Sequence, residues 1–159
     1  MEQQTLSHGI SAETATGVSL FLTPVVRNLI ALAVNAKQAH WHLRGMNFIA
    51  LHEFLDQLHD HANDGADEAA ERIIALGLPV DARLETVAAK ATNPTLTAGF
   101  QQAEDVLREM LAQLDATRVV LQQAIDGLGE IDAPSQDVAI ALTQQLDKDR
   151  WFLSAHLGA

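Results

Sequence analysis

The stretch from residue 47 to residue 76 constrains the fold most, because its apolar residues recur at helical spacing. Steps of three and four residues separate them, which puts one apolar stripe along a single long helix. The eight members are Leu51, Leu55, Leu58, Ala62, Ala66, Ala69, Ile73 and Leu76. A helix with such a stripe buries it against other helices, so the pattern predicts a helical bundle.

Three further long helical patterns and one short one fill the rest of the chain. The expected helices are about Thr16–Leu43, Asn47–Leu76, 82–90, from after Thr97 to Gly127 or Gly129, and from after Ser135 to near His156. Pro24 either kinks the first helix or marks its first turn after an N-cap at Thr23. There is no strand pattern. We therefore expect an all-α fold, a four-helix bundle with a short extra helix between helices two and three, in a single domain at 16–159 after a flexible tail at 1–15.

Composition and charge narrow the class of protein. Apolar residues make up 48% of the 159 and aromatic residues 4%, so the core is expected to be aliphatic. The absence of cysteine excludes disulfides and thiolate metal sites. The net charge of -11 repels nucleic acid and attracts cations. Neither a signal peptide nor an unbroken run of 18 apolar residues is present, so we expect a cytoplasmic protein with no membrane partner.

Two pairs of metal-binding side chains lie on the outward face of the predicted second helix. His52 and Asp56 are four residues apart, and Asp67 and Glu71 repeat that spacing. Each pair can hold one edge of a divalent cation with imidazole and carboxylate donors. Asp56 and Asp67 are, however, separated by about 16 Å along one helix, so the pairs of a single chain cannot share an ion.

A second copy of the chain resolves this separation. If two such helices lie antiparallel across a twofold axis near residues 60–63, His52 and Asp56 of one face Asp67 and Glu71 of the other. His40, near the end of the first helix, can reach the same place. Two imidazoles and three carboxylates suit iron(II). From spacing alone, this metal site and a solvated acidic surface remain equally acceptable interpretations.

The segment from Lys37 to Gly77 resembles the signature of the Dps family, the mini-ferritins named as DNA-binding proteins from starved cells. The shared features are His-Trp before a glycine, then Phe and Leu-His, an aspartate one turn later, and Asp-x-x-x-Glu-Arg at fixed offsets. The resemblance continues to residues 146–148 and to Trp151-Phe152, and it covers nearly the whole chain. No Glu-x-x-His motif of the larger ferritins is present, which argues against a di-iron site inside one bundle.

The resemblance implies a ferritin-like fold, a hollow shell of twelve subunits and a ferroxidase site at each twofold interface. It assigns His40, His52 and Asp56 to one subunit, and Asp67 and Glu71 to its neighbour. The implied reaction oxidises iron(II), preferably with hydrogen peroxide, and stores the ferric product as mineral. Zinc or another divalent cation is an alternative occupant of the same site.

Further residues are candidates for supporting roles, and each also has a purely structural interpretation. Lys37 and Trp41 flank the site in sequence, and Trp41 either accepts stray electrons or, as we favour, packs in the core. Glu53 either nucleates mineral or is a solvated glutamate. Four acids either line an entry pore or are plain loop residues: Asp126, Glu130, Asp132 and Asp137. For His42, His59 and His61 we expect surface positions, with a second metal site near His59 as the alternative.

The chain departs from the family in its tails. Many members bind DNA through lysine-rich tails, whereas residues 1–26 here contain no Lys or Arg and nothing basic follows Arg150. Direct contact with phosphates needs cations, so we expect little direct DNA binding. Iron oxidation and storage is therefore the leading function. Nucleoid compaction with secondary iron chemistry, or a plain helical interaction domain, are the alternatives.

Overall fold

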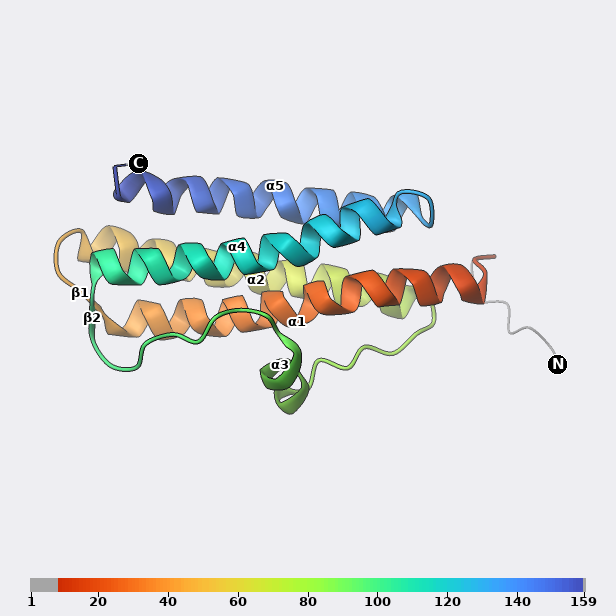
Figure 1. Ribbon diagram of the computed structural model, residues 1–159, viewed down its shortest axis with the longest axis horizontal. Coiled ribbons are helices and arrows are strands. Elements are labelled where there is room, and N and C mark those ends of the chain that lie inside the picture. Colours follow the sequence, from red (N-terminus) through yellow and green to blue (C-terminus); the bar gives the residue numbers. More distant parts are fainter. Residues whose placement is uncertain (1–8, 159) are drawn as a thin grey trace.

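A computed structural model describes residues 9–158 of the chain, and four long helices dominate it (Figure 1). The elements are α1 Ala12–His42, β1 Leu43–Arg44, α2 Phe48–Ala75, α3 Leu84–Lys90, β2 Gln101–Gln102, α4 Ala103–Leu128 and α5 Ala133–His156. The short helix α3 lies in the long connection between α2 and α4. The predicted four-helix bundle with an extra short helix is confirmed.

The start of α1 differs from the sequence-based expectation. Ser11 is the N-cap, and its side-chain oxygen accepts a hydrogen bond from the backbone N–H of Thr14 at 3.1 Å. This bond satisfies one of the free N–H groups at the helix start, so the helix begins at Ala12 rather than Thr16. Pro24 lies inside α1, and the alternative in which Thr23 caps a helix there is wrong.

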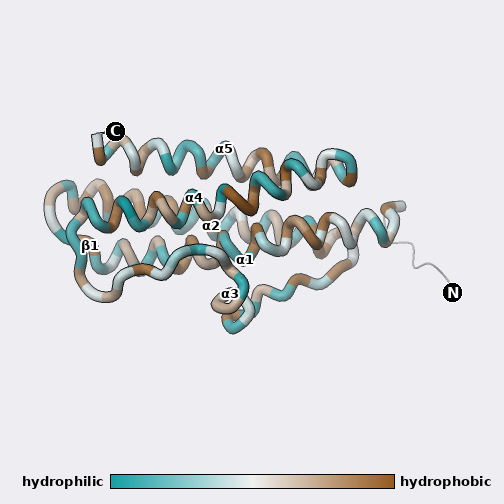
Figure 2. The backbone as a smooth tube through the Cα atoms, viewed as in Figure 1, coloured by the Kyte–Doolittle hydropathy of each residue, from teal (hydrophilic) through white to brown (hydrophobic). Residues whose placement is uncertain are grey.

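The core is aliphatic, as the composition predicts. Leu, Val, Ile and Ala side chains from the four long helices form one continuous buried cluster, to which Phe54 and Met110 add. Hydrophobic and hydrophilic residues alternate along all four of these helices (Figure 2). The helix α1 packs against both α2 and α4, while α5 packs mainly against α4. The pair α1–α2 is therefore the rigid frame on which the candidate site is built.

Within residues 9–158, α1 is the one helix that is long and apolar enough to cross a membrane, judged by length and composition. Of its most apolar stretch, 44% is buried inside the bundle. Core helices of helical bundles have this character, so bundle packing accounts for the apolar residues of α1.

Two strands of two residues each were not predicted. Leu43 and Arg44 pair in parallel with Gln101 and Gln102, which joins the end of α1 to the start of α4. Gly45 follows β1 with a φ of 105°, a conformation that favours glycine. The strand pair fixes the turn between α1 and α2, and that turn sets the register of the two helices at the site.

Candidate metal site

His40 of α1 and His52 of α2 form the centre of the candidate site. Their rings are stacked, with centroids 3.6 Å apart and an angle of 17° between the planes. His40 Nδ1 lies 2.6 Å from the backbone oxygen of His52, and His52 Nδ1 lies 2.9 Å from that of His40. A carbonyl oxygen only accepts hydrogen bonds, so both Nδ1 atoms carry the proton. In the neutral ring the lone pair is then on Nε2, the form of histidine that binds metals.

Asp56 lies one turn along α2 from His52 and supplies a carboxylate beside the two rings. Its Oδ1 atom is 3.5 Å from His40 Nδ1, and the same atom accepts a hydrogen bond from the ammonium group of Lys37. This bond to Lys37 holds the pKa of Asp56 below its ordinary value, although partial burial acts in the opposite direction. The carboxylate is thus ionised at neutral pH. Two imidazole nitrogens and one carboxylate are a donor set that fits iron(II) or zinc.

Asp67 and Glu71 lie farther along α2 and are both exposed. Asp67 borders an open groove of about 730 Å³ between α1, α2 and residues 80–83. Its apolar walls include Val26, Ile30 and Ile74. Among the residues that the structure describes, no three His, Asp or Glu side chains form a group that can hold a metal ion. One chain therefore sets His40, His52 and Asp56 near one another without completing a metal site, and it leaves Asp67 and Glu71 apart from them.

Residues predicted to flank the site have mixed outcomes. Lys37 contacts the site directly through Asp56. Trp41 is 63% exposed, so its expected place in the core is wrong, because position 41 faces away from the bundle while His40 and Ala39 are buried. Glu53 is exposed, as either of its interpretations requires.

Three further histidines, His42, His59 and His61, are each held at Nδ1 by another group of the chain. His42 bonds to the carbonyl of Gln38 in its own helix at 2.9 Å, and His59 to the carbonyl of Ala33 in α1 at 2.9 Å. His61 lies 3.0 Å from both carboxylate oxygens of Asp149 in α5. Each is partly buried, so the expectation that they are plain surface histidines is too simple.

Asp149 was missed by sequence reasoning. It is 1% exposed and also accepts a hydrogen bond from Gln145 Nε2 at 3.2 Å. Burial raises the pKa of its carboxyl group, and the hydrogen bonds from His61 and Gln145 offset only part of this effect. The sequence did contain a pattern that indicates burial of Asp149. Its position continues the helical spacing of the buried residues Leu142, Leu146 and Leu153.

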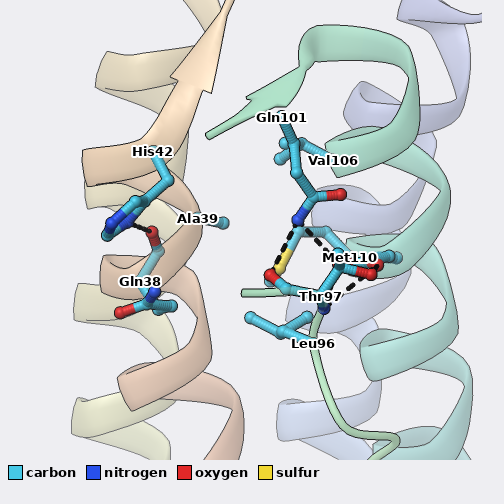
Figure 3. A pocket seen from close by; sticks show the side chains of 9 residues that line it. Gln38, Ala39, His42, Leu96, Thr97, Gln101, Val106 and Met110 are labelled. Atoms are coloured by element: carbon cyan, nitrogen blue, oxygen red, sulfur yellow. Dashed lines mark hydrogen bonds between the residues drawn. The ribbon is translucent and has the colours of Figure 1, made fainter. Parts of the chain in front are cut away.

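A small cavity lies beside His42, between α1, residues 96–101 and α4 (Figure 3). Gln101 Nε2 donates to the carbonyl of Thr97 at 2.9 Å and to Glu109 at 3.3 Å, which closes one side of it. The cavity volume is about 10 Å³. That is the space of one water molecule, so this cavity does not hold an organic substrate.

One of the four acids considered for an entry pore has a structural role. Asp132 is the N-cap of α5, and it accepts hydrogen bonds from the backbone N–H of Ser135 at 3.0 Å and from Arg72 of α2 at 2.7 Å. The other three, Asp126, Glu130 and Asp137, are exposed, and their place at a pore remains a prediction.

Comparison with known proteins identifies the family. Residues 22–159 match the ferritin-like domain family. The DNA protection during starvation protein of Agrobacterium fabrum is 31% identical over 86% of this chain and 85% of its own length. The fine tangled pili major subunit of Haemophilus ducreyi is 33% identical over 94% of this chain and 79% of its own length.

A solved structure matches more closely in sequence. Dps from Microbacterium arborescens, in its high iron form, is 54% identical, with a TM-score of 0.91 and coverage of 94% of this chain and 97% of that one. The resemblance drawn from the segment Lys37 to Gly77 is confirmed. These matches, the four-helix bundle and the position of α3 show that the chain belongs to the Dps family of ferritin-like proteins.

Proposed function

We propose that this protein oxidises iron(II) and stores the ferric product, at sites formed by His40, His52 and Asp56 of one subunit with Asp67 and Glu71 of the partner subunit. The observation that carries the proposal is the reciprocal bonding of the two histidines. Each backbone carbonyl fixes the tautomer of the other ring, so in the neutral rings both Nε2 atoms carry a lone pair, and the ionised carboxylate of Asp56 lies one turn along α2 from His52. Membership of the Dps family supports iron storage in general.

The pairing of two subunits follows from the distribution of these donors. Three ligands lie at one end of the α1–α2 face, and two exposed carboxylates lie toward the other end, where Asp67 borders an open groove. An antiparallel twofold contact across this face brings both sets together twice, and it covers the apolar walls of the groove. We propose twelve such subunits in a closed shell, with ferric mineral inside.

The chemistry requires the protein to bind and orient iron(II) and to favour the ferric state. The neutral imidazoles bind iron(II) without added charge, while three carboxylates stabilise the ferric ion more strongly because its charge is higher. Hydrogen peroxide accepts two electrons when its O–O bond breaks, so one peroxide oxidises two iron(II) ions. Removing both reactants protects DNA without direct contact. We place this activity in the cytoplasm, and zinc is expected to compete for the same donors.

The direct test adds hydrogen peroxide to the purified protein and iron(II), and follows ferric absorbance and particle size together. The double variant His52→Ala, Asp56→Ala should oxidise iron more slowly while the particle stays intact. A matched variant, His156→Ala with Asp105→Ala, removes one exposed histidine and one exposed aspartate away from the site and should retain the wild-type rate. Equal rates in the two variants would move the site elsewhere. No ferric absorbance above the buffer control would exclude the function.

A second candidate function is nucleoid compaction by direct DNA binding, and it is considered because the name of the Agrobacterium fabrum relative refers to protection of DNA. The absence of Lys and Arg before Arg27 weighs against it here. We therefore propose it only as the alternative.

A further inference from the structure

His59 belongs to the same row of side chains as the candidate ligands. On α2, His52, Asp56, His59 and Asn63 follow one another at steps of four, three and four residues, so they share one face. Each of the first three contacts α1: His52 at His40, Asp56 at Lys37 and His59 at the carbonyl of Ala33. His59 thus lies one turn beyond Asp56, between the group His40, His52 and Asp56 and the groove.

The hydrogen bond to Ala33 fixes the tautomer of His59. A carbonyl only accepts, so Nδ1 of His59 donates its proton across 2.9 Å, and in the neutral ring Nε2 is the acceptor. The side chain is half-buried already in the single chain. A partner that covers this face would bury Nε2 further, and an acceptor buried without a donor lowers the stability of the contact.

Asn63 would also lose its contact with water if a second copy covered this face. Its side chain is exposed and borders the groove beside Val26, Ile30 and Ala66. If a second copy covers these apolar walls, the amide of Asn63 loses water and needs another partner. The twofold pairing proposed above sets His52 opposite Glu71 and Asp56 opposite Asp67. The same antiparallel register, continued toward the axis, sets His59 opposite Asp64 of the other copy and beside Asn63. Of these two side chains, only the amide of Asn63 donates a hydrogen bond.

We infer that Nε2 of His59 accepts a hydrogen bond from the side-chain amide of Asn63 of the partner subunit, and that the two symmetry-related bonds fix the register of the twofold contact. This inference rests on the pairing in the proposed function. A shift of one residue moves one helix by about 1.5 Å along the other. Metal–ligand bonds are about 2 Å long, so such a shift would misplace the carboxylates of the partner.

A double-mutant cycle tests the inference. His59→Leu and Asn63→Leu keep similar volume and remove one member of the bond, and the double variant removes both. Subunit dissociation is measured by sedimentation over a dilution series without added metal. Each single variant should raise the dissociation constant about tenfold or more, because a polar group is left unpaired. The double variant should return to within about threefold of the wild type, since no polar group remains unpaired.

Two further variants sharpen the result. His59→Gln offers an amide oxygen to the same donor and should stay near the wild-type dissociation constant, whether or not His59→Leu folds. Gln57→Leu, an exposed change elsewhere on α2, should have no effect. Additive losses in the double variant, or tighter association of Asn63→Leu alone, would overturn the inference.

The failures of the two proposals are distinguishable. A wild-type chain that is monomeric at every concentration contradicts the pairing and this inference together. A wild type that associates but gives an additive cycle contradicts the hydrogen bond and leaves iron oxidation standing. Non-additive coupling in a protein that does not oxidise iron supports the bond and contradicts the function.

Discussion

Asp149 is a carboxylate in the core, and its surroundings predict an unusual dependence of stability on pH. Burial raises its pKa, and the bonds from His61 and Gln145 only partly compensate. The folded chain therefore binds this proton more tightly than the unfolded chain does. As pH rises from the ordinary aspartate pKa of about 3.9 through the raised value, this residue lowers the free energy of unfolding.

Asp149→Asn should remove that contribution, because the asparagine does not titrate yet keeps an oxygen for His61 and Gln145. The free energy of unfolding, measured with denaturant at fixed protein concentration, should fall less steeply with rising pH in the variant than in the wild type across this range. The comparison is between slopes, so a constant loss of stability in the variant does not affect it. Identical slopes would mean that the carboxyl group titrates alike in both states.

Single residues were predictable where spacing alone carries the signal. The i, i+4 pairs placed His52 with Asp56, and the structure brings His40 to them through the end of α1. Roles that depend on a contact between distant helices were not predictable. The hydrogen bond between Lys37 and Asp56 joins residues 19 positions apart, and the one between His61 and Asp149 joins residues 88 positions apart. No local sequence pattern encodes such pairs.

At the scale of elements, the start of α5 depends on one side chain. Asp132 caps the helix through the N–H of Ser135 and links it to α2 through Arg72. Asp132→Ala removes both interactions and should lower the free energy of unfolding by about 1–3 kcal/mol. Glu130→Ala, an exposed change two residues earlier, is the control and should differ from the wild type by less than about 0.5 kcal/mol.

The same residue predicts a second dependence on pH, opposite in sign to that of Asp149. Burial raises the pKa of Asp132, but the hydrogen bonds from Ser135 and Arg72 outweigh it, so the net pKa is lowered. Its stabilising contribution is present above the ordinary pKa of about 3.9 and is lost as pH falls through the lowered value. The difference between wild type and Asp132→Ala should therefore shrink on acidification below about pH 4. A difference that stays constant down to pH 2 would contradict this.

The helices were predictable because each long one has its own apolar stripe, whereas their ends depend on caps. The second helix was expected at Asn47–Leu76 and runs over Phe48–Ala75. The third long helix was expected after Thr97 and begins at Ala103. Before this start, the carboxylate of Glu109 accepts a hydrogen bond from the backbone N–H of Thr97 at 3.2 Å. This bond holds the preceding chain outside the helix. The pairing of β1 with β2 joins segments 58 residues apart and is too short to leave a pattern.

At the scale of the whole molecule, the distribution of charge bears on DNA. Six of the ten basic residues are in ion pairs with carboxylates: Lys37, Arg72, Arg83, Arg108, Arg118 and Arg150. Arg44 lies over the ring of Phe100, with its Cζ atom 3.5 Å from the ring centroid. With a net charge of -11, the surface has few cations to offer to phosphates. Non-specific DNA binding draws its free energy mainly from such contacts.

We therefore expect no retardation of duplex DNA in a gel at physiological salt and neutral pH when divalent cations are absent. Replacing Glu2, Gln3 and Gln4 with lysine should create retardation that weakens as salt is raised, because each chain then carries added cations that can contact phosphates. This variant is the positive control, because it shows that the gel assay detects DNA binding once lysines are present in the N-terminal segment. Tight retardation by the wild type without divalent cations would instead mean that DNA is held by surfaces other than basic tails. Protection of DNA by this protein would then not depend on iron removal alone.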